Sequence, residues 1–271
     1  MTYIRLTFSS EMLHGNTDVS VFYPDPPRLP GPPGPRPEAT GSSKYDKRKR
    51  YQVLWLMHGG GGDYTDWPLD AMIQRKCNAA QIVVVMPTIR DFVSMMSGAD
   101  YLRYVAEELP EFIGFLFPIS RKREDNFIAG LSYGGYFSYR VALNYPEQYA
   151  CVGSFSSPLD VAMDIQRYHA DSPTHPRYDT IAGTDLDVMG MAARLKEAGH
   201  YIPRMYQACG TEDFTWDFNI SARDHFRSLS LDHTWVQGTG AHTFEFWDEH
   251  LKRFIDWLPL KGAGFIPGEE E

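Results

Sequence analysis

The sequence predicts an α/β protein built on a mostly parallel sheet that helices cover on both faces. Two leading strand-like segments are followed by a regular alternation of apolar, strand-length runs and helical stretches. Apolar residues make up 43% of the 271 residues, enough for a sizeable core. We expect eight strands, with the second antiparallel to the others, in a single domain over residues 1–271.

The elements follow from local patterns. Residues 2–13 and 17–23 are expected to form two strands joined by a turn at "HGNT". Residues 99–117 have helical spacing, and Pro110 should kink that helix or mark a helix start. The remaining expected strands are 51–58, 81–88, 126–131, 149–157, 202–210 and 233–238, and the remaining helices are 68–80, 136–146, 187–199, 220–230 and 243–258.

Two segments are expected to lack regular structure. Residues 25–50 are rich in Pro, Gly and Ser, and we interpret them as a surface loop between two strands. Residues 158–186 are interpreted as an irregular, lid-like insert that is short for a full lid.

Charge and composition exclude several classes of protein. The formal net charge is −9, which argues against a nucleic-acid surface, and the one basic cluster, Lys44 to Arg50, is interpreted as a solvated charge run. No run is apolar enough for a membrane span, and the first residues do not resemble a signal peptide. Three widely spaced cysteines predict neither disulfides nor a zinc site, so we expect a cytoplasmic protein.

A serine lies between glycines where a predicted strand turns into a helix. The stretch Gly130-Leu131-Ser132-Tyr133-Gly134-Gly135 has the pattern G-x-S-x-G. A tight turn there strains the central residue and lifts its hydroxyl clear of the backbone, and it leaves no space for side chains two positions away. The pattern predicts that Ser132 is a nucleophile.

A nucleophilic serine needs a base and an acid, which should follow later strands in that fold. His242 follows strand 233–238 in a glycine-flanked loop, and Asp213 follows strand 202–210. Glu212 and Asp217 remain alternatives for the acid. Among the other histidines, His225, His233 and His250 are excluded as the base by position, whereas His169 and His175 are expected to be solvated or part of the lid.

A second glycine cluster, Gly59 to Gly62, follows strand 51–58. It lacks the lysine of a phosphate-binding loop, so acyl transfer explains it better. The backbone amides of Gly60 and Tyr133 are expected to bind an oxyanion, with the amide of Gly61 as a further candidate, and His58 is expected to fix the loop. The aromatic residues Tyr64, Trp67, Tyr133 and Trp216 are candidates for the substrate pocket.

With these residues in place, the chain resembles the α/β-hydrolase superfamily and, within it, the "Putative esterase" family of tributyrin, feruloyl and acetyl-xylan esterases and S-formylglutathione hydrolases. The resemblance rests on "LMHGGGGDYTDW", "EELPEFIGFLFPISRKREDNFIAGLSYGGYFSYRVALNYPEQYA", "CGTEDF" and "GAHTFEFW". It implies the same triad, Ser132, Asp213 and His242. The family usually has Met after the nucleophile, and the ring of Tyr133 at that position is expected to narrow the acyl pocket.

The sequence therefore predicts a serine carboxylesterase that acts on small-molecule esters with short or aromatic acyl groups, without a cofactor or metal. The alternatives are a thioesterase similar to S-formylglutathione hydrolase and a non-catalytic binding member of the fold. The sequence leaves the formation of homo-oligomers open.

Overall fold

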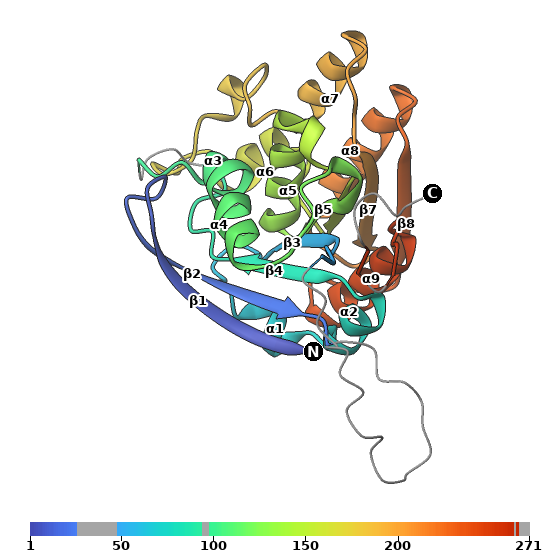
Figure 1. Cartoon of the computed structure of the whole chain (residues 1–271). Coiled ribbons are helices and arrows are strands. Elements are labelled where there is room, and N and C mark those ends of the chain that lie inside the picture. The colour runs from blue at the N-terminus through green and yellow to red at the C-terminus, as the bar shows by residue number, and fades with distance from the viewer. Residues whose placement is uncertain (26–47, 94–97, 263, 266–271) are drawn as a thin grey trace, which may run out of the picture.

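The computed structural model describes residues 1–25, 48–93, 98–262 and 264–265, and these residues form one eight-stranded sheet with the order β1-β2-β4-β3-β5-β6-β7-β8 (Figure 1). The strands are β1 (Thr2–Ser10), β2 (Gly15–Tyr23), β3 (Val53–Met57), β4 (Val83–Pro87), β5 (Asn126–Leu131), β6 (Cys151–Phe155), β7 (Arg204–Gly210) and β8 (His233–Gly238). Strand β2 pairs antiparallel with both neighbours, whereas all pairs from β4 to β8 are parallel. The predicted α/β sheet is confirmed.

Helices cover both faces of this sheet (Figure 1). They are α1 (Asp66–Asp70), α2 (Gln74–Ala80), α3 (Tyr101–Arg103), α4 (Leu109–Leu116), α5 (Tyr133–Asn144), α6 (Val161–Tyr168), α7 (Val188–Glu197), α8 (Trp216–Ser228) and α9 (Phe244–Trp257). A π-helical turn, Tyr104–Glu108, joins α3 to α4, and short 3-10 turns lie at Arg123–Asp125, Pro146–Gln148 and Tyr178–Thr180.

The sheet divides the core into two layers because alternate side chains of a strand point to opposite faces. In β3, Val53, Trp55 and Met57 pack against the layer that includes α4, α5 and α7, whereas Leu54 and Leu56 pack against the layer that includes α1, α2 and α9. Every residue of β3 is buried, as expected for a central strand covered on both faces. The two layers hold the strand ends rigidly in place.

Several element bounds differ from the sequence prediction. The helix predicted over 68–80 is two helices, because Ala71 has an extended backbone and ends α1. Pro110 lies in the first turn of α4, directly after the π-helical turn, which confirms its predicted place at a helix start. Helix α5 begins at Tyr133 rather than at 136.

The prediction that 158–186 is irregular is wrong for part of that segment. Residues Val161–Tyr168 form helix α6, and the Asp160 carboxylate caps it by accepting a hydrogen bond of 3.1 Å from the Met163 amide. The predicted loop over 25–50 and the basic run from Lys44 lie mostly outside the described residues.

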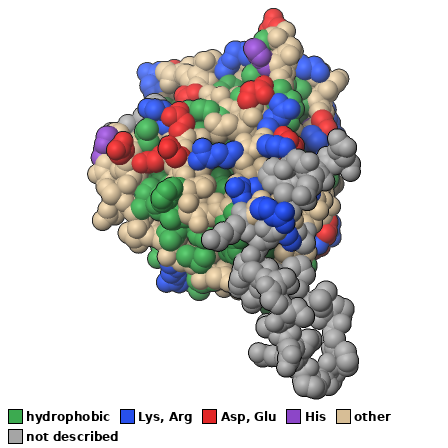
Figure 2. All heavy atoms as spheres, viewed as in Figure 1, with side chains coloured by type: hydrophobic (Ala, Val, Ile, Leu, Met, Phe, Trp, Pro, Cys, Tyr) green, Lys and Arg blue, Asp and Glu red, His purple; other side chains and the backbone are tan. Residues whose placement is uncertain are grey.

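Charges of both signs occur on the face that Figure 2 shows. On the face in Figure 2, Lys and Arg side chains are interspersed with Asp and Glu side chains rather than gathered into one basic area. Among the described residues, none of the helices combines the length and the apolar character that crossing a bilayer requires.

One buried histidine should make the fold sensitive to acid. His250 on α9 is 4% exposed and stacks on Phe246, and burial lowers its pKa to about 4. Between about pH 6.5 and 4 the unfolded chain therefore binds the proton and the folded chain does not, so stability falls as pH falls. We predict that His250→Gln removes roughly 1–3 kcal/mol of this loss.

The measurement is the free energy of urea unfolding at several values between pH 7 and 4.5. The control is His200→Gln, which changes an exposed histidine. A pH slope in His250→Gln that equals the wild-type slope would show that His250 does not cause the acid sensitivity.

Candidate active site

Ser132 occupies a strained turn between β5 and α5. Its φ is 51° and its ψ is −130°, a backbone conformation that residues other than glycine rarely adopt. The neighbouring glycines leave no space for a side chain: a Cβ on Gly130 would lie 2.4 Å from the carbonyl carbon of Gly134. A Cβ on Gly134 would lie 2.0 Å from the His58 carbonyl oxygen. The glycines of the motif are therefore a steric requirement of the turn.

Three side chains from three strand ends meet at this turn. His242, in the loop between β8 and α9, places its Nε2 3.0 Å from the Ser132 hydroxyl. Its Nδ1 lies 3.0 and 3.1 Å from the two carboxylate oxygens of Asp213, in the loop between β7 and α8. The carboxyl ends of parallel strands share one edge of the sheet, which brings together residues that are 110 and 29 positions apart in sequence.

The surroundings of Asp213 favour its ionised form. Its side chain is fully buried and accepts hydrogen bonds from the Thr215 amide at 2.8 Å and the Thr215 hydroxyl at 2.7 Å. Burial alone would raise the pKa of Asp213, but hydrogen bonds from His242 and Thr215 outweigh it, so the pKa lies below its ordinary value. Because this carboxylate can only accept, it fixes the proton of His242 on Nδ1. The Nε2 lone pair then faces Ser132.

The His242 ring is held from two further sides. The ring of Phe214 lies 4.4 Å away and the indole of Trp247 lies edge-on at 4.8 Å, measured between centroids. The side chain is 19% exposed, so Nε2 can reach a substrate while the ring keeps its orientation.

The alternative acids and bases are engaged elsewhere. Glu212 is exposed and accepts a hydrogen bond from the Gly240 amide, and Asp217 pairs with Arg167 at 3.0 Å. His225 bonds the Met189 carbonyl at 3.0 Å, and His233 bonds Gln207 at 3.0 Å. Of the weighed candidates, Asp213 and His242 alone form a chain that reaches Ser132.

The glycine loop lies directly against the serine turn. A Cβ on Gly59 would lie 3.3 Å from Ser132 Cβ, and one on Gly60 would lie 3.2 Å from the ring of Tyr133. Gly61 has a φ of 78°, which suits glycine, and the Gly62 amide closes a turn onto the Gly59 carbonyl.

Within the described parts of the chain, the backbone amides of Gly60, Gly61 and Tyr133 have no hydrogen-bond acceptor. Two of these amides belong to the glycine loop that contacts the serine turn, and the third directly follows Ser132 in the chain.

His58 fixes the glycine loop, as expected from the sequence. Its Nε2 accepts a hydrogen bond of 2.8 Å from the Ile89 amide, so Nδ1 carries the proton and donates to the Gly59 carbonyl at 2.7 Å. The residue is 1% exposed, and burial lowers its pKa. The neutral ring therefore ties the glycine loop to the segment after β4.

A cavity of about 680 Å³ opens beside the serine turn. Two glycines of the glycine loop, three aromatic rings and two histidines are among the described residues that line it. The full lining is Gly60, Gly61, Arg90, Asp91, Phe92, Val93, Tyr101, Tyr133, His169, Thr174 and His175. The two imidazoles stack with their centroids 4.1 Å apart. His169 and His175, which were expected to be solvated or part of the lid, both line this cavity.

The aromatic residues predicted for the pocket are mostly elsewhere. The prediction for Trp67 is wrong, because its ring is 1% exposed, bonds the Met57 carbonyl and packs against Phe155 in the core. Tyr64 lies near Arg5, and Trp216 packs on Trp235. Neither lines the cavity; of the four, only Tyr133 does.

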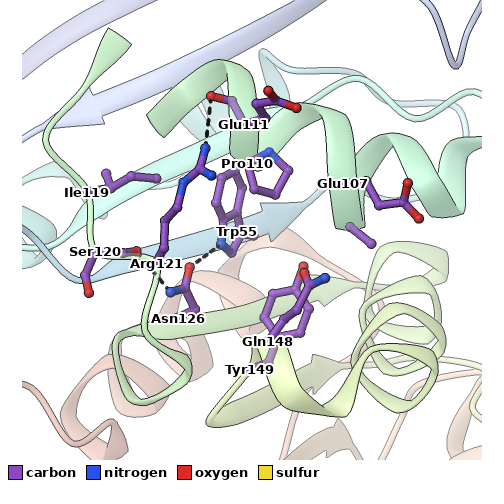
Figure 3. Close-up of a pocket in the computed structure, with 11 residues that line it drawn as sticks. Trp55, Glu107, Pro110, Glu111, Ile119, Ser120, Arg121, Asn126, Gln148 and Tyr149 are labelled. Carbon is purple, nitrogen blue, oxygen red and sulfur yellow. Dashed lines mark hydrogen bonds between the residues drawn. The ribbon is translucent and has the colours of Figure 1, made fainter. Parts of the chain in front are cut away.

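A second cavity, of about 320 Å³, lies at the opposite end of the central strands, beyond the start of β5 (Figure 3). One of its walls is Asn126, the first residue of β5, roughly 20 Å along the strand from Ser132. Its polar groups bond one another: Trp55 donates to Asn126 at 3.1 Å, and Asn126 donates to the Ser120 and Lys122 carbonyls. Arg121 reaches the Glu111 carbonyl, as Figure 3 shows. This cavity is separate from the serine site.

Sequence reasoning missed two residues beside the serine. Phe92 lines the cavity, and Asp164 on α6 accepts a hydrogen bond from the Tyr133 hydroxyl. A signal for α6 was present, because Asp160 is a good N-cap and Val161, Ile165 and Tyr168 follow at helical spacing. Among the described residues, no cluster of three or more metal-ligating side chains occurs.

Fold and site together define a hydrolase with a serine turn at the end of the fifth strand. The chain matches the family described as "Putative esterase" over residues 42–253, and it therefore belongs to that family. It is a carboxylic ester hydrolase of the α/β-hydrolase fold.

Individual relatives agree with this assignment. An acetyl esterase of Caldicellulosiruptor saccharolyticus is 26% identical and covers 95% of this chain and 98% of its own length. The S-formylglutathione hydrolase of Staphylococcus aureus is 25% identical, with a TM-score of 0.80 over 95% of this chain and 98% of that one. A ferulic acid esterase with 18% identity and a TM-score of 0.74, over 95% of this chain and 97% of that one, shares the fold.

The steric role of Gly134 gives a testable prediction. Gly134→Ala places a methyl group against the His58 carbonyl, which is backbone and cannot move aside cheaply, so we expect a loss of about 1–3 kcal/mol or more in unfolding free energy. Urea unfolding measures it. The control is Gly15→Ala, where a Cβ meets nothing within 4 Å and the change should stay within about 0.5 kcal/mol. Equal effects at the two positions would contradict the steric account.

Proposed function

We propose that this protein is a serine carboxylesterase that hydrolyses short-chain or aromatic acyl esters through a triad of Ser132, His242 and Asp213. The observation that carries the proposal is the position of His242, which is within hydrogen-bond distance of Ser132 on one nitrogen and of Asp213 on the other. A bridging imidazole with a fixed tautomer is what converts a serine hydroxyl into a nucleophile.

The first half-reaction follows from this geometry. His242 Nε2 takes the hydroxyl proton while Ser132 Oγ attacks the ester carbonyl carbon, and the carbonyl oxygen becomes an oxyanion. The unpaired amides of Gly60, Gly61 and Tyr133 are the proposed donors to it, and one such donor stabilises the transition state by about 3 kcal/mol. His242 then returns the proton to the departing alcohol, and Asp213 stabilises the imidazolium between these steps.

Water completes the cycle on the acyl-enzyme. His242 removes a proton from a water molecule, the hydroxide attacks the acyl carbon, and Ser132 leaves with the proton from His242. The cavity of about 680 Å³ offers space for acyl groups from acetyl to aromatic ones. The acetyl esterase among the relatives and the apolar rings in the cavity support this range.

A second candidate function is the hydrolysis of thioesters by the same residues. It is favoured by the likeness to the S-formylglutathione hydrolase of Staphylococcus aureus. A non-catalytic binding role has no comparable support, because the three side chains are positioned for chemistry.

Two further features remain proposals. A single domain fits the one sheet to which all described strands belong. A cytoplasmic location fits the three cysteines, because all three are free thiols. Burial raises their pKa values to about 12, so they stay protonated at neutral pH.

The esterase proposal predicts the effect of removing the nucleophile. We expect Ser132→Ala to lower kcat for p-nitrophenyl acetate by about 10⁴-fold or more, because neither the hydroxyl nor a replacement nucleophile remains. Steady-state kinetics measure it, with Ser228→Ala as the control, since that serine is exposed on α8. Full turnover in Ser132→Ala would overturn the proposal.

Preference between an ester and a thioester substrate separates the two candidate functions. We predict that kcat/KM for phenyl acetate exceeds that for S-formylglutathione by about tenfold or more, a difference of roughly 1.4 kcal/mol in transition-state binding. Both substrates are assayed with the same enzyme preparation. The reverse order would establish the thioesterase candidate instead.

A further inference from the structure

The residue after the nucleophile is linked to helix α6 by a partly buried hydrogen bond. The Tyr133 hydroxyl donates to the carboxylate of Asp164, which is 3% exposed. Burial raises the pKa of Asp164, and burial together with the nearby carboxylate raises the pKa of Tyr133. The phenol therefore keeps its proton at neutral pH and remains the donor.

The Tyr133 ring is fixed on its faces as well as at its tip. Phe92 lies nearly parallel to it, with centroids 6.1 Å apart and an interplanar angle of 22°. The edge of the Tyr133 ring lies against Gly60, because a Cβ on Gly60 would be 3.2 Å from Tyr133 Cδ2. The Tyr133 ring thus contacts both the glycine loop and Phe92 in the cavity wall. The hydrogen bond of its hydroxyl to Asp164 fixes the orientation of the ring.

Helix α6, which carries Asp164, makes contacts with helix α8 at both of its ends. The Asp160 carboxylate, which caps α6, also accepts a hydrogen bond of 2.6 Å from Ser221 on α8. Arg167 pairs with Asp217 on α8 at 3.0 Å, and its guanidinium lies over the ring of Phe218. Contacts at both ends of α6 fix the position of Asp164 between them.

The acyl group of a substrate must lie on the side of Tyr133. His242 protonates the departing alcohol, so the alcohol has to face His242 and the acyl group has to point away from it. The cavity lined by Tyr133, Phe92 and Gly60 does not include His242. An acetyl group stays close to Ser132, whereas an aromatic acyl group reaches the rings.

We propose that Asp164 is a positioning residue for the acyl group: through the Tyr133 hydroxyl it fixes one wall of the acyl cavity, and so it sets the rate for bulky acyl esters relative to acetyl esters. The inference rests on the proposed esterase function. A fixed wall binds a large planar acyl group without a further loss of side-chain freedom, whereas a wall free to rotate has to be ordered in every turnover.

The test compares two substrates and a double-mutant cycle. We measure kcat and KM for p-nitrophenyl benzoate and p-nitrophenyl acetate in Tyr133→Phe, Asp164→Ala and the double variant. Tyr133→Phe retains the ring and the backbone amide. We expect the ratio of kcat/KM for benzoate over acetate to fall about fivefold or more in each single variant and no further in the double variant.

Matched controls come from a second tyrosine–carboxylate pair. The Tyr145 hydroxyl donates to Glu107 at 3.0 Å, and Glu107 borders the cavity at the opposite end of the central strands. Tyr145→Phe should leave the benzoate-to-acetate ratio unchanged.

Asp164→Asn, whose amide oxygen can still accept from Tyr133, should recover a ratio near that of the wild type.

The outcomes separate the possible failures. An unchanged ratio in Tyr133→Phe overturns the inference, even where Asp164→Ala does not fold. Additive effects in the double variant also overturn it, because the two residues would then act independently. Hydrolysis that survives in Ser132→Ala would instead sink the proposed function, whatever the ratios show.

Discussion

The site depends on one strained backbone conformation, the positive φ of Ser132 between β5 and α5. That conformation points the hydroxyl out of the chain, and it is possible only because Gly130 and Gly134 leave space for each other and for the His58 carbonyl. The strain is offset by the layers of core on both faces of the sheet, which keep β5 and α5 in place. Every other part of the site is arranged around that hydroxyl.

Three loops, each after a different strand, bring chemistry to it. The loop after β3 contributes unpaired amides, the loop after β7 a buried carboxylate and the loop after β8 the imidazole. The loops have different supports: His58 secures the first, the Thr215 amide and hydroxyl bind the carboxylate of the second, and aromatic contacts hold the imidazole of the third. Function therefore rests on short hydrogen-bonded loops at the edge of a rigid sheet, and the helix α6 adds a support for the residue after the nucleophile.

The sequence was sufficient to predict this arrangement where local chemistry decides the structure. A serine between glycines at a strand end and a histidine and an acid after later strands follow from strain and chain order, and their convergence needed only the rule that parallel strands share a carboxyl edge. Packing decided the rest. Whether Trp67 on helix α1 lines a pocket or fills the core depends on Met57 and Phe155, which lie on strands β3 and β6. Helix α6 was not predicted because it is short and the sequence on either side of it is rich in turn-forming residues. Without α6 the role of Asp164 could not be inferred.

The central claim is that Ser132, unlike other serines of the chain, is made reactive by His242 and Asp213. Labelling with a fluorophosphonate followed by peptide mass spectrometry tests it most directly, because that reagent reacts covalently with an activated serine. The account predicts a single adduct on the peptide that carries Ser132, and its loss in His242→Ala. An adduct at another serine, or equal labelling of Ser132 without His242, would contradict it.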